Sequence, residues 1–367
     1  MNISIKSIIP LCLIICFIMP PSIFAFIPEQ YQTLYLYTIT GLYWMILLLF
    51  LKPVFLKKDN SLATSFTLII LAMSIISFLV KGQLSLFNVI FPISSLAIFK
   101  LCQNYKATNN RYLFIVYFLF IYLVCYLNYY STLPDFFYRP DFNEDMLYGA
   151  SSNAIPLALN NSLIAYMMLN YIFKWNASLS IFLISIINIL LNIIQQGRSG
   201  IFVGLMLLFI ATFELYPPLF KKYKKLFSII GIFLVIFAIR GILNLIGNVD
   251  LLSYSFFQEK RVIAQIAFFQ QMSTSTFIFG FPSGTMFGAE TYTFNMFLDF
   301  WNKYNIFSMI LLIFFMIYRI FNSKKFFIPL YYLFPISFYM MFESIYLPSF
   351  WDFYIYIFLF LPSDNKW

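Results

Sequence analysis

Histidine is absent from this sequence: none of its 367 residues is a histidine. The chain therefore has no imidazole general base, no zinc site built from histidines and no histidine proton relay. Charged residues are scarce too, at 10% of the chain, whereas a soluble globular domain carries about 25%. This scarcity excludes an ordinary soluble domain.

Cysteine is also rare, and its spacing is not that of a metal site. The four cysteines lie in or beside apolar runs, and no C-x-x-C pair occurs, so we expect free thiols packed as small apolar groups. Neither a G-x-G-x-x-G loop nor a P-loop lysine motif is present. Without a nucleotide site, energy for any reaction has to come from the substrate or from a gradient. The cysteines are Cys12, Cys16, Cys102 and Cys125.

Apolar residues dominate what remains, with 62% hydrophobic residues, 49 of them Phe and 27 Tyr. Runs near the ~20 residues that a helix needs to cross a bilayer recur along the whole chain. Strands of a membrane barrel would instead alternate apolar and polar side chains in short segments. The sequence predicts an all-α, polytopic integral membrane protein that forms one domain over residues 1–367.

About twelve spanning helices are expected. The first has an alternative interpretation, because Lys6, an apolar core and Ala25 also fit a cleavable signal peptide. The orientation after Glu29 is the same in both cases. The expected spans are 8–26, 34–51, 62–80, 84–101, 112–131, 153–173, 177–195, 200–219, 226–243, 304–320, 327–345 and 350–362.

Lys and Arg residues set the orientation of these spans. Most of them fall on one side when both termini are placed in the cytoplasm, as the positive-inside rule requires. Two outer connections are long, 132–152 after the fifth span and 244–303 after the ninth, and the inner ones are short and basic. We therefore expect these two outer loops to cap any active site. The outer basic residues are Lys81, Arg139, Arg198, Arg240, Lys260, Arg261 and Lys303.

Arg198 stands in the turn QQGRSG, between the seventh and eighth expected spans. Gly197 and Gly200 allow a tight turn, Ser199 adds a hydroxyl, and the next helix starts with unpaired N–H groups. An Arg at a helix N-terminus is suited to an anion, phosphate above all. The alternative is a snorkelling Arg at a helix end, with Gly200 and Gly204 as a small-residue packing pair.

Arg240 and Arg261 are two further outer cations. Arg240 lies deep in an apolar span, within FAIRGIL, where a charge is expected to face the bundle interior or a cavity. Arg261 begins a stretch with helical apolar spacing, which we interpret as a short helix on the membrane surface. Lys260 beside it is expected to be a solvated interfacial charge. The expected apolar face contains Val262, Ile263, Ile266 and Phe269.

Arg139 lies in the first long outer loop among acidic residues. The sequence DFNED beside it fits a divalent-metal site, a solvated loop or a set of hydrogen-bond acceptors for sugar hydroxyls. We favour the last two interpretations over the metal. The acidic neighbours are Asp135, Asp141, Glu144 and Asp145.

The second long loop ends in FIFGFPSGTMFGAETYTFNMFLDFW. Glycines spaced by four residues predict bends or close backbone approach here. The aromatic residues between them offer flat surfaces for sugar rings, or an interfacial anchor. The glycines are Gly280, Gly284 and Gly288, and the polar candidates are Glu290, Asn295 and Asp299.

Three stretches within about 185–320 resemble, in order, motifs of the O-antigen polymerase and ligase superfamily of bacterial envelope enzymes. QGRSGI is similar to its Ser/Gly-Arg-Ser/Thr-Gly turn, and Arg261 followed by FIFGFPSGT is similar to its Arg segment before a Phe-Gly-x-Gly turn. ETYTFNMFLDFWNKYNIF is similar to its His-Asn entry into a late helix. Phe294 replaces the His, however, and the glycine pair usual after Asn295 is missing. The absent His and the two outer loops favour a polymerase over a ligase.

The resemblance implies a glycosyltransferase that needs no metal, nucleotide sugar or other cofactor. It is expected in the bacterial inner membrane, with its site facing the periplasm. A growing glycan on polyprenyl diphosphate would be transferred to the non-reducing end of a lipid-linked repeat unit. The implied partners are the bilayer, this lipid-linked oligosaccharide, and a flippase and chain-length regulator of the same pathway, with no nucleic acid. The expected roles are diphosphate binding for Arg198, Arg240 and Arg261, general base for Glu290 or Asp299, and substrate binding for Arg139, Asn295 and Ser199.

A ligase of the same superfamily and a flippase for lipid-linked oligosaccharides are the alternatives. A transporter is expected to carry ionisable residues near the midplane of several helices and often an internal repeat. Here the unusual charges fall in the outer half and no repeat is visible. A scaffold without chemistry would leave the depth of Arg240 unexplained.

Overall fold

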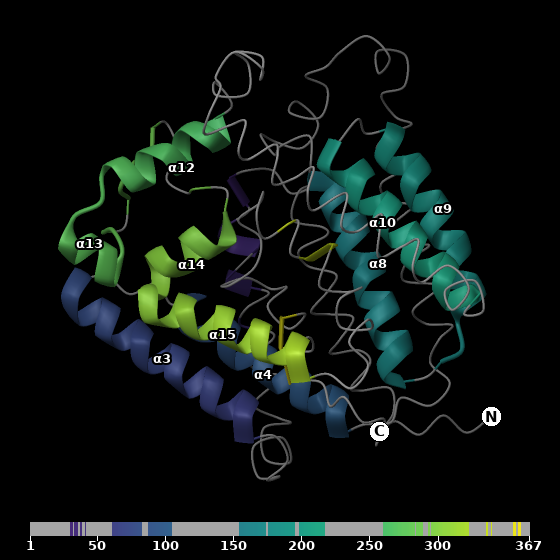
Figure 1. The fold of residues 1–367 in the computed structure, drawn as a ribbon, viewed down its shortest axis with the longest axis horizontal. Coiled ribbons are helices and arrows are strands. Elements are labelled where there is room, and N and C mark those ends of the chain that lie inside the picture. Colours follow the sequence, from purple (N-terminus) through teal and green to yellow (C-terminus); the bar gives the residue numbers. More distant parts are fainter. Residues whose placement is uncertain are drawn as a thin grey trace.

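The computed structural model describes a set of helices whose arrangement is shown in Figure 1. Within the described residues every regular element is a helix and no strand occurs, which confirms the all-α class. The described residues are 30–31, 33–35, 37–38, 41, 61–82, 87–104, 154–173, 175–194, 198–216, 260–282, 284–288, 293, 295–322, 335–336, 339, 355–356 and 359–360.

Six of the predicted spans are helices whose bounds agree with the prediction to within about one turn. Each follows a run of apolar residues, because a helix satisfies its own backbone N–H and C=O groups within such a run. They are α3 (Ser61–Lys81), α4 (Phe87–Asn104), α8 (Ala154–Phe173), α9 (Ser178–Ile194), α10 (Arg198–Leu215) and α15 (Ile306–Asn322).

The other six predicted spans lie wholly or largely outside the described residues. Of 34–51, 327–345 and 350–362 only isolated positions are described, and these are helical. The total of twelve spans, the side of each terminus and the nature of the first segment therefore remain predictions. The spans wholly outside the described residues are 8–26, 112–131 and 226–243.

Within the described part, α3 is the one helix that is both long and apolar enough to cross a membrane. Its stretch Leu62–Lys81 has 20 residues with a mean hydropathy of 2.3, and only 33% of the most apolar window is buried inside the protein. Most of its apolar side chains therefore face outward. The shorter apolar helical stretches are Asn88–Ala97, Ser178–Ile193, Gly200–Leu215 and Ile306–Arg319.

The described helices form two packed groups. In the first, α8, α9 and α10 contact one another, and in the second α3 contacts α4, α15 and two short helices, α13 (Thr274–Phe279) and α14 (Met296–Tyr304) (Figure 1). The C-terminal region reaches both groups. The hydroxyl of Tyr339 accepts a hydrogen bond from α8, while the Tyr356 hydroxyl lies 2.8 Å from Thr67 Oγ1 on α3.

Residues 260–304 were predicted as loop with one surface helix, and that prediction is incomplete. The surface helix is α12 (Lys260–Gln270), and it is followed by α13 and α14. The predicted span 304–320 also begins too early. Asn305 has a φ of 106° and separates α14 from α15. The two short helices were missed because each is well below the length at which apolar periodicity identifies a helix.

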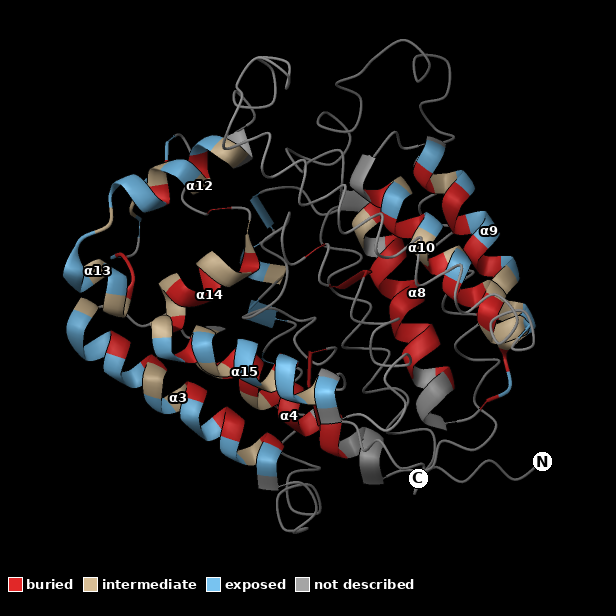
Figure 2. Cartoon of the chain, viewed as in Figure 1, coloured by how far each residue is buried: buried red, intermediate tan, exposed pale blue. Residues whose placement is uncertain are grey.

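Helix α9 buries its polar side chains and exposes apolar ones, unlike a helix on the surface of a soluble protein. Ser185, Asn188 and Asn192 are completely buried, whereas Leu183 and Leu190 are more than half exposed. Buried and exposed stretches alternate along α9 (Figure 2). An outward apolar surface also occurs on α15, where Phe307 is 57% exposed. Surfaces of this kind mark contact with lipid or with another apolar partner.

Candidate functional site

Arg198 lies at the start of a helix, as predicted. The helix was expected at 200–219, and α10 begins two residues earlier, at Arg198 itself. Arg198 and Ser199 therefore belong to the first turn, where backbone N–H groups have no partner within the helix and the helix dipole is positive. The backbone expected to bind an anion is thus the first turn of α10.

Gly200 brings the start of α10 into close contact with its neighbours. A Cβ atom at Gly200 would collide with Pro156 on α8 and would lie 2.9 Å from Asn192 Oδ1 on α9. At Gly204 the nearest atoms would be 3.1 Å away on Asn192 and 3.3 Å away on Ile189. The small-residue packing predicted for Gly200 and Gly204 is confirmed.

Three completely buried asparagines join the helices beneath this turn. Asn160 on α8 donates from Nδ2 to the carbonyl oxygen of Gly200, at 2.9 Å, and to the hydroxyl of Tyr339, at 2.7 Å. Its Oδ1 accepts from Asn188 Nδ2 at 2.6 Å and from Asn192 Nδ2 at 3.1 Å. We call α8, α9 and α10 with this network the asparagine bundle.

Two hydrogen-bond acceptors in the described part of the asparagine bundle have no donor. Within the described part of the chain, Asn188 Oδ1 and Asn192 Oδ1 are buried and have no hydrogen-bond partner. A buried polar atom without a partner costs about 1–3 kcal/mol. The network therefore does not maximise stability, which calls for another reason for its presence.

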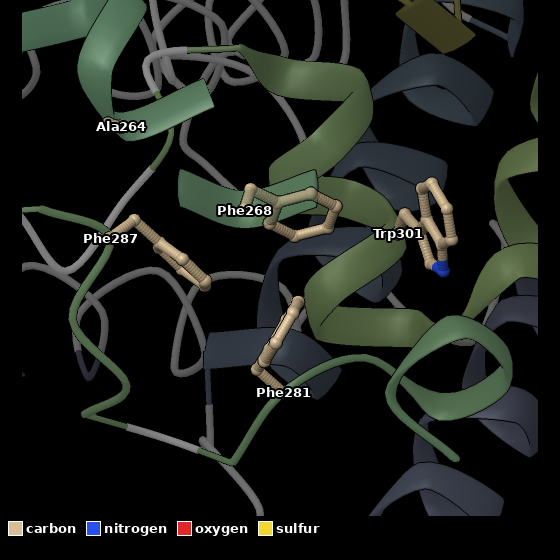
Figure 3. Close-up of a cluster of buried hydrophobic side chains, with 5 residues drawn as sticks. All are labelled: Ala264, Phe268, Phe281, Phe287 and Trp301. Carbon is tan, nitrogen blue, oxygen red and sulfur yellow. The ribbon is translucent and has the colours of Figure 1, made fainter. Parts of the chain in front are cut away.

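The described residues of 260–304 form a second unit, which we call the aromatic cap. Its centre is Phe268 on α12, whose ring centroid lies 5.0 Å from Phe281, 5.3 Å from Phe287 and 5.5 Å from Trp301 (Figure 3). Phe281 and Phe287 lie between the predicted glycine bends and are 5% and 0% exposed. The expectation that these aromatics present flat surfaces to sugars is wrong for both, since they fill the core of the cap.

Gly280, Asn302 and Lys81 attach the aromatic cap to α3. Gly280 has a φ of 80°, which favours glycine, and a Cβ there would lie 2.8 Å from the Asn302 Cα. The Asn302 Oδ1 accepts from the Phe281 N–H at 2.6 Å, and Lys81 Nζ donates to the Asn302 carbonyl. Gly284 and Gly288 also have positive φ, which confirms the predicted bends.

Asn295 and Asp299 both order the start of α14. Asn295 was expected to orient a sugar or a backbone group, and its Oδ1 caps the helix by accepting from the N–H groups of Phe297 and Leu298, at 3.0 and 3.2 Å. Asp299 is 3% exposed, and its Oδ1 accepts from both N–H and Oγ1 of Thr293, each at 3.0 Å. These bonds make Asp299 a brace for the segment before α14, and its expected role as a base remains a prediction.

Helix α12 begins at Lys260, so Arg261 lies in its first turn as predicted. Ile263, Ile266 and Phe269 on its expected apolar face are 41%, 41% and 55% exposed. The opposite face packs into the aromatic cap through Ala264 and Phe268. The helix therefore carries apolar side chains both toward the cap and on its outward surface.

The remaining predicted site residues are not placed by the structure. Arg139, Arg240 and Glu290 lie outside the described residues, and for Arg198, Ser199 and Arg261 only the backbone is described. The buried asparagines and Lys81 were missed as site residues. The available signal was polar side chains within apolar spans, above all Asn188 and Asn192 one helical turn apart.

Comparison with known proteins adds no relative: no family model, no curated protein and no solved structure matches the chain. The family resemblance therefore depends on the three motifs within 185–320. Of these, the structure describes the backbone of the first at the start of α10, and it describes parts of the other two within the aromatic cap.

Proposed function

We propose that this protein is a polymerase of a bacterial surface polysaccharide. It transfers a growing glycan from polyprenyl diphosphate to a hydroxyl at the non-reducing end of a lipid-linked repeat unit. The new glycosidic bond forms as the bond to the diphosphate breaks, and polyprenyl diphosphate leaves. The reaction takes place on the outer face of the inner membrane and draws its energy from the diphosphate ester.

A multi-pass membrane location is supported by the polarity of the described helices. On α9 the amides of Asn188 and Asn192 point inward, while Leu183 and Leu190 are more than half exposed. In water this arrangement would cost free energy twice, because it buries polar groups and exposes apolar ones. In lipid both costs fall. Within this setting, α8, α9, α10 and α15 join α3 as spanning helices.

The diphosphate site is proposed at the start of α10. A departing diphosphate gains charge in the transition state, and fixed donors in a water-poor place stabilise that charge strongly. Arg198 supplies a permanent cation, Ser199 a hydroxyl, and the first helical turn its unpaired N–H groups. Arg240 and Arg261 are proposed as additional cations around the same group.

The attacking hydroxyl has to lose a proton, and the chain has no histidine to take it. Carboxylates are then the best general bases available. Glu290 is our first choice. The bonds of Asp299 to Thr293 leave it less free to approach a substrate, so Asp299 comes second. Arg139 and Asn295 are proposed on the glycan side.

The observation that carries this proposal is the position of Arg198 in the first turn of α10, at one end of a bundle with buried asparagines and an apolar outward face on α9. The test uses purified protein in vesicles, with lipid-linked repeat units supplied on the outer face. We expect a ladder of polymers without added metal or nucleotide sugar. Arg198→Ala should lower kcat by about 100-fold or more, the size expected when one donor to a developing negative charge is removed.

Arg319 provides the matched control. It is also an arginine at a helix end, but it lies in the last turn of α15, whereas Arg198 lies in the first turn of α10. Arg319→Ala should leave kcat within about threefold of the wild type, since interfacial charges contribute little to a distant site. Unchanged ladders with Arg198→Ala present in the membrane would remove the diphosphate role. Lipid-linked repeats that cross the vesicle membrane without elongation would indicate a flippase, and transfer to a lipid A acceptor would indicate a ligase.

A further inference from the structure

The asparagine bundle contains polar groups that no substrate can reach. Asn160, Asn188 and Asn192 are each 0% exposed. Yet the network they form ends on the carbonyl of Gly200, two residues from Arg198. We infer that Asn160 is a positioning residue, which holds the first turn of α10 and thereby the backbone that carries Arg198. This inference depends on the diphosphate site of the proposed function.

The orientation of the Asn160 amide is fixed from both sides. Its Oδ1 accepts two hydrogen bonds, from Asn188 and Asn192 on α9. Both donor positions of Nδ2 are therefore directed away from α9, toward Gly200 at 2.9 Å and Tyr339 at 2.7 Å. An amide held in this way cannot flip without breaking all four bonds.

The hydrogen bond to the Gly200 carbonyl matters because glycine has no side chain that could fix the rotation of α10 about its own axis. Van der Waals contact with Pro156 and Asn192 restricts how closely α10 approaches, but it does not fix where the helix begins. A hydrogen bond to the Gly200 carbonyl fixes the position of the first turn, because hydrogen bonds are directional. The bond from Asn160 therefore ties the first turn of α10 to α8 and to Tyr339.

Stability alone does not account for this arrangement. Two acceptors, Asn188 Oδ1 and Asn192 Oδ1, are buried without a partner in the described part of the chain. Hydrogen bonds between membrane helices contribute modestly to stability, and small or apolar residues would pack the same helices without orphaned atoms. A precise position for the α10 start is a task that apolar packing would perform less well.

The experiment compares Asn160→Leu, which keeps the shape of the side chain, with Asn170→Leu on the same helix. Asn170 is a suitable control because it is 9% exposed and its Oδ1 accepts from the Ala177 N–H at 3.0 Å, at the other end of α8. Polymerisation in vesicles gives kcat and the KM of the lipid-linked donor. We expect Asn160→Leu to lower kcat about 10- to 100-fold, the cost of displacing a catalytic group by ~1 Å. Asn170→Leu should change kcat by less than about threefold, although both variants lower the thermal midpoint.

A double mutant separates positioning from general damage. If Asn160 acts through Arg198, then Asn160→Leu should cause little further loss of kcat in an Arg198→Ala protein, because residues that act as a unit are not additive. Equal losses in both backgrounds, or equal losses for Asn160→Leu and Asn170→Leu, would overturn the inference. Should Asn160→Leu fail to accumulate, Tyr339→Phe keeps the ring, removes only the hydroxyl, and is expected to lower kcat about five- to tenfold.

Binding of geranylgeranyl diphosphate distinguishes failure of this inference from failure of the proposed function. Wild-type protein should bind this probe more tightly than geranylgeraniol, and Asn160→Leu should weaken the binding about tenfold while Asn170→Leu does not. Binding with this pattern but without polymer formation would refute the polymerase and keep the positioning role. Polymer formation with equal binding by both variants would refute the positioning role and keep the polymerase. If the wild-type protein does not bind the probe, both are refuted.

Discussion

The asparagine bundle and the aromatic cap solve the same packing problem with different chemistry. In the bundle, three amides and two glycines let α8, α9 and α10 approach one another closely. In the cap, Phe268 and the three aromatic rings around it fill the core, and side-chain amides cap or brace the short helices. Orphaned buried acceptors occur in the bundle at Asn188 and Asn192.

The difference indicates a division of labour. No buried side-chain polar atom described in the cap lacks a hydrogen-bond partner, and Trp301 Nε1, for example, donates to the Phe277 carbonyl at 2.7 Å. The bundle instead directs its polar groups at the helix start that carries Arg198. We therefore expect substitutions in the cap to act mainly on folding, and those in the bundle to act on catalysis as well.

The largest effect is expected at the joint between the cap and α3. Gly280→Ala places a Cβ against the Asn302 backbone at a φ of 80°, which should cost about 3 kcal/mol or more from strain and overpacking together. Thermal unfolding in detergent measures this. Gly284→Ala is the control, since its φ is 82° but nothing lies within 4 Å of the added Cβ. It should cost about 1–2 kcal/mol, and equal losses would contradict the role of the Asn302 contact.

In the bundle, Gly200→Ala is expected to lower both stability and activity. The added Cβ meets Pro156 and approaches Asn192 Oδ1 to 2.9 Å, which should cost about 1–3 kcal/mol and shift the start of α10. Gly204→Ala meets looser contacts, at 3.1 Å or more, and should stay within about 1 kcal/mol of the wild type because alanine also favours a helix. Polymer yield and unfolding midpoints, measured on both variants, test whether the bundle tolerates displacement at the start of α10.

Asp299 tests whether the cap is only structural. Asp299→Asn keeps an Oδ1 that can accept from both Thr293 donors, but it removes the carboxylate. We expect it to retain at least about half of the polymerase activity, whereas Asp299→Ala should cost about 1–3 kcal/mol of stability by leaving the Thr293 N–H unpaired. Activity lost in Asp299→Asn at unchanged stability would instead identify Asp299 as the general base and displace Glu290.

The smallest effect concerns the outward face of α12. A nitroxide spin label at Ile266, in a variant free of native cysteines, should hardly change stability, because that side chain is 41% exposed. If the face meets lipid, oxygen will relax the label more strongly than a water-soluble nickel complex. A label at Thr274, an exposed polar position on α13, is the control and should show the reverse order. The same order at both positions would refute an interfacial α12.

The sequence predicted the long elements and the bends well. Six apolar runs were recognised as helices because length and hydropathy alone decide where a membrane helix can form. The short helices of the cap were harder. Asn295 caps the start of α14 and Asn305 lies at its end. Asparagines are visible in the sequence, but they are too common to identify a nine-residue helix without its packing partners.

Some residues of the candidate site could be predicted from the sequence, and others could not. Arg198 could be singled out because a cation between two apolar runs is unusual at any depth. Asn160 could not be linked to it, because Gly200 and Tyr339 are 40 and 179 residues away along the chain. The aromatics between the glycines were expected to meet sugars or to anchor the chain at the interface, because composition does not show whether a ring points inward or outward.

By itself, the sequence determined that this protein is helical, that its apolar runs are long enough for a membrane, and that no histidine can serve its chemistry. These properties are local, since they depend on residue type and spacing along the chain. The tertiary structure decided that α10 begins at Arg198, that Asn160 holds that turn, and that Phe281 and Phe287 lie inside the cap. Those properties depend on contacts between distant segments, and only packing in three dimensions fixes them.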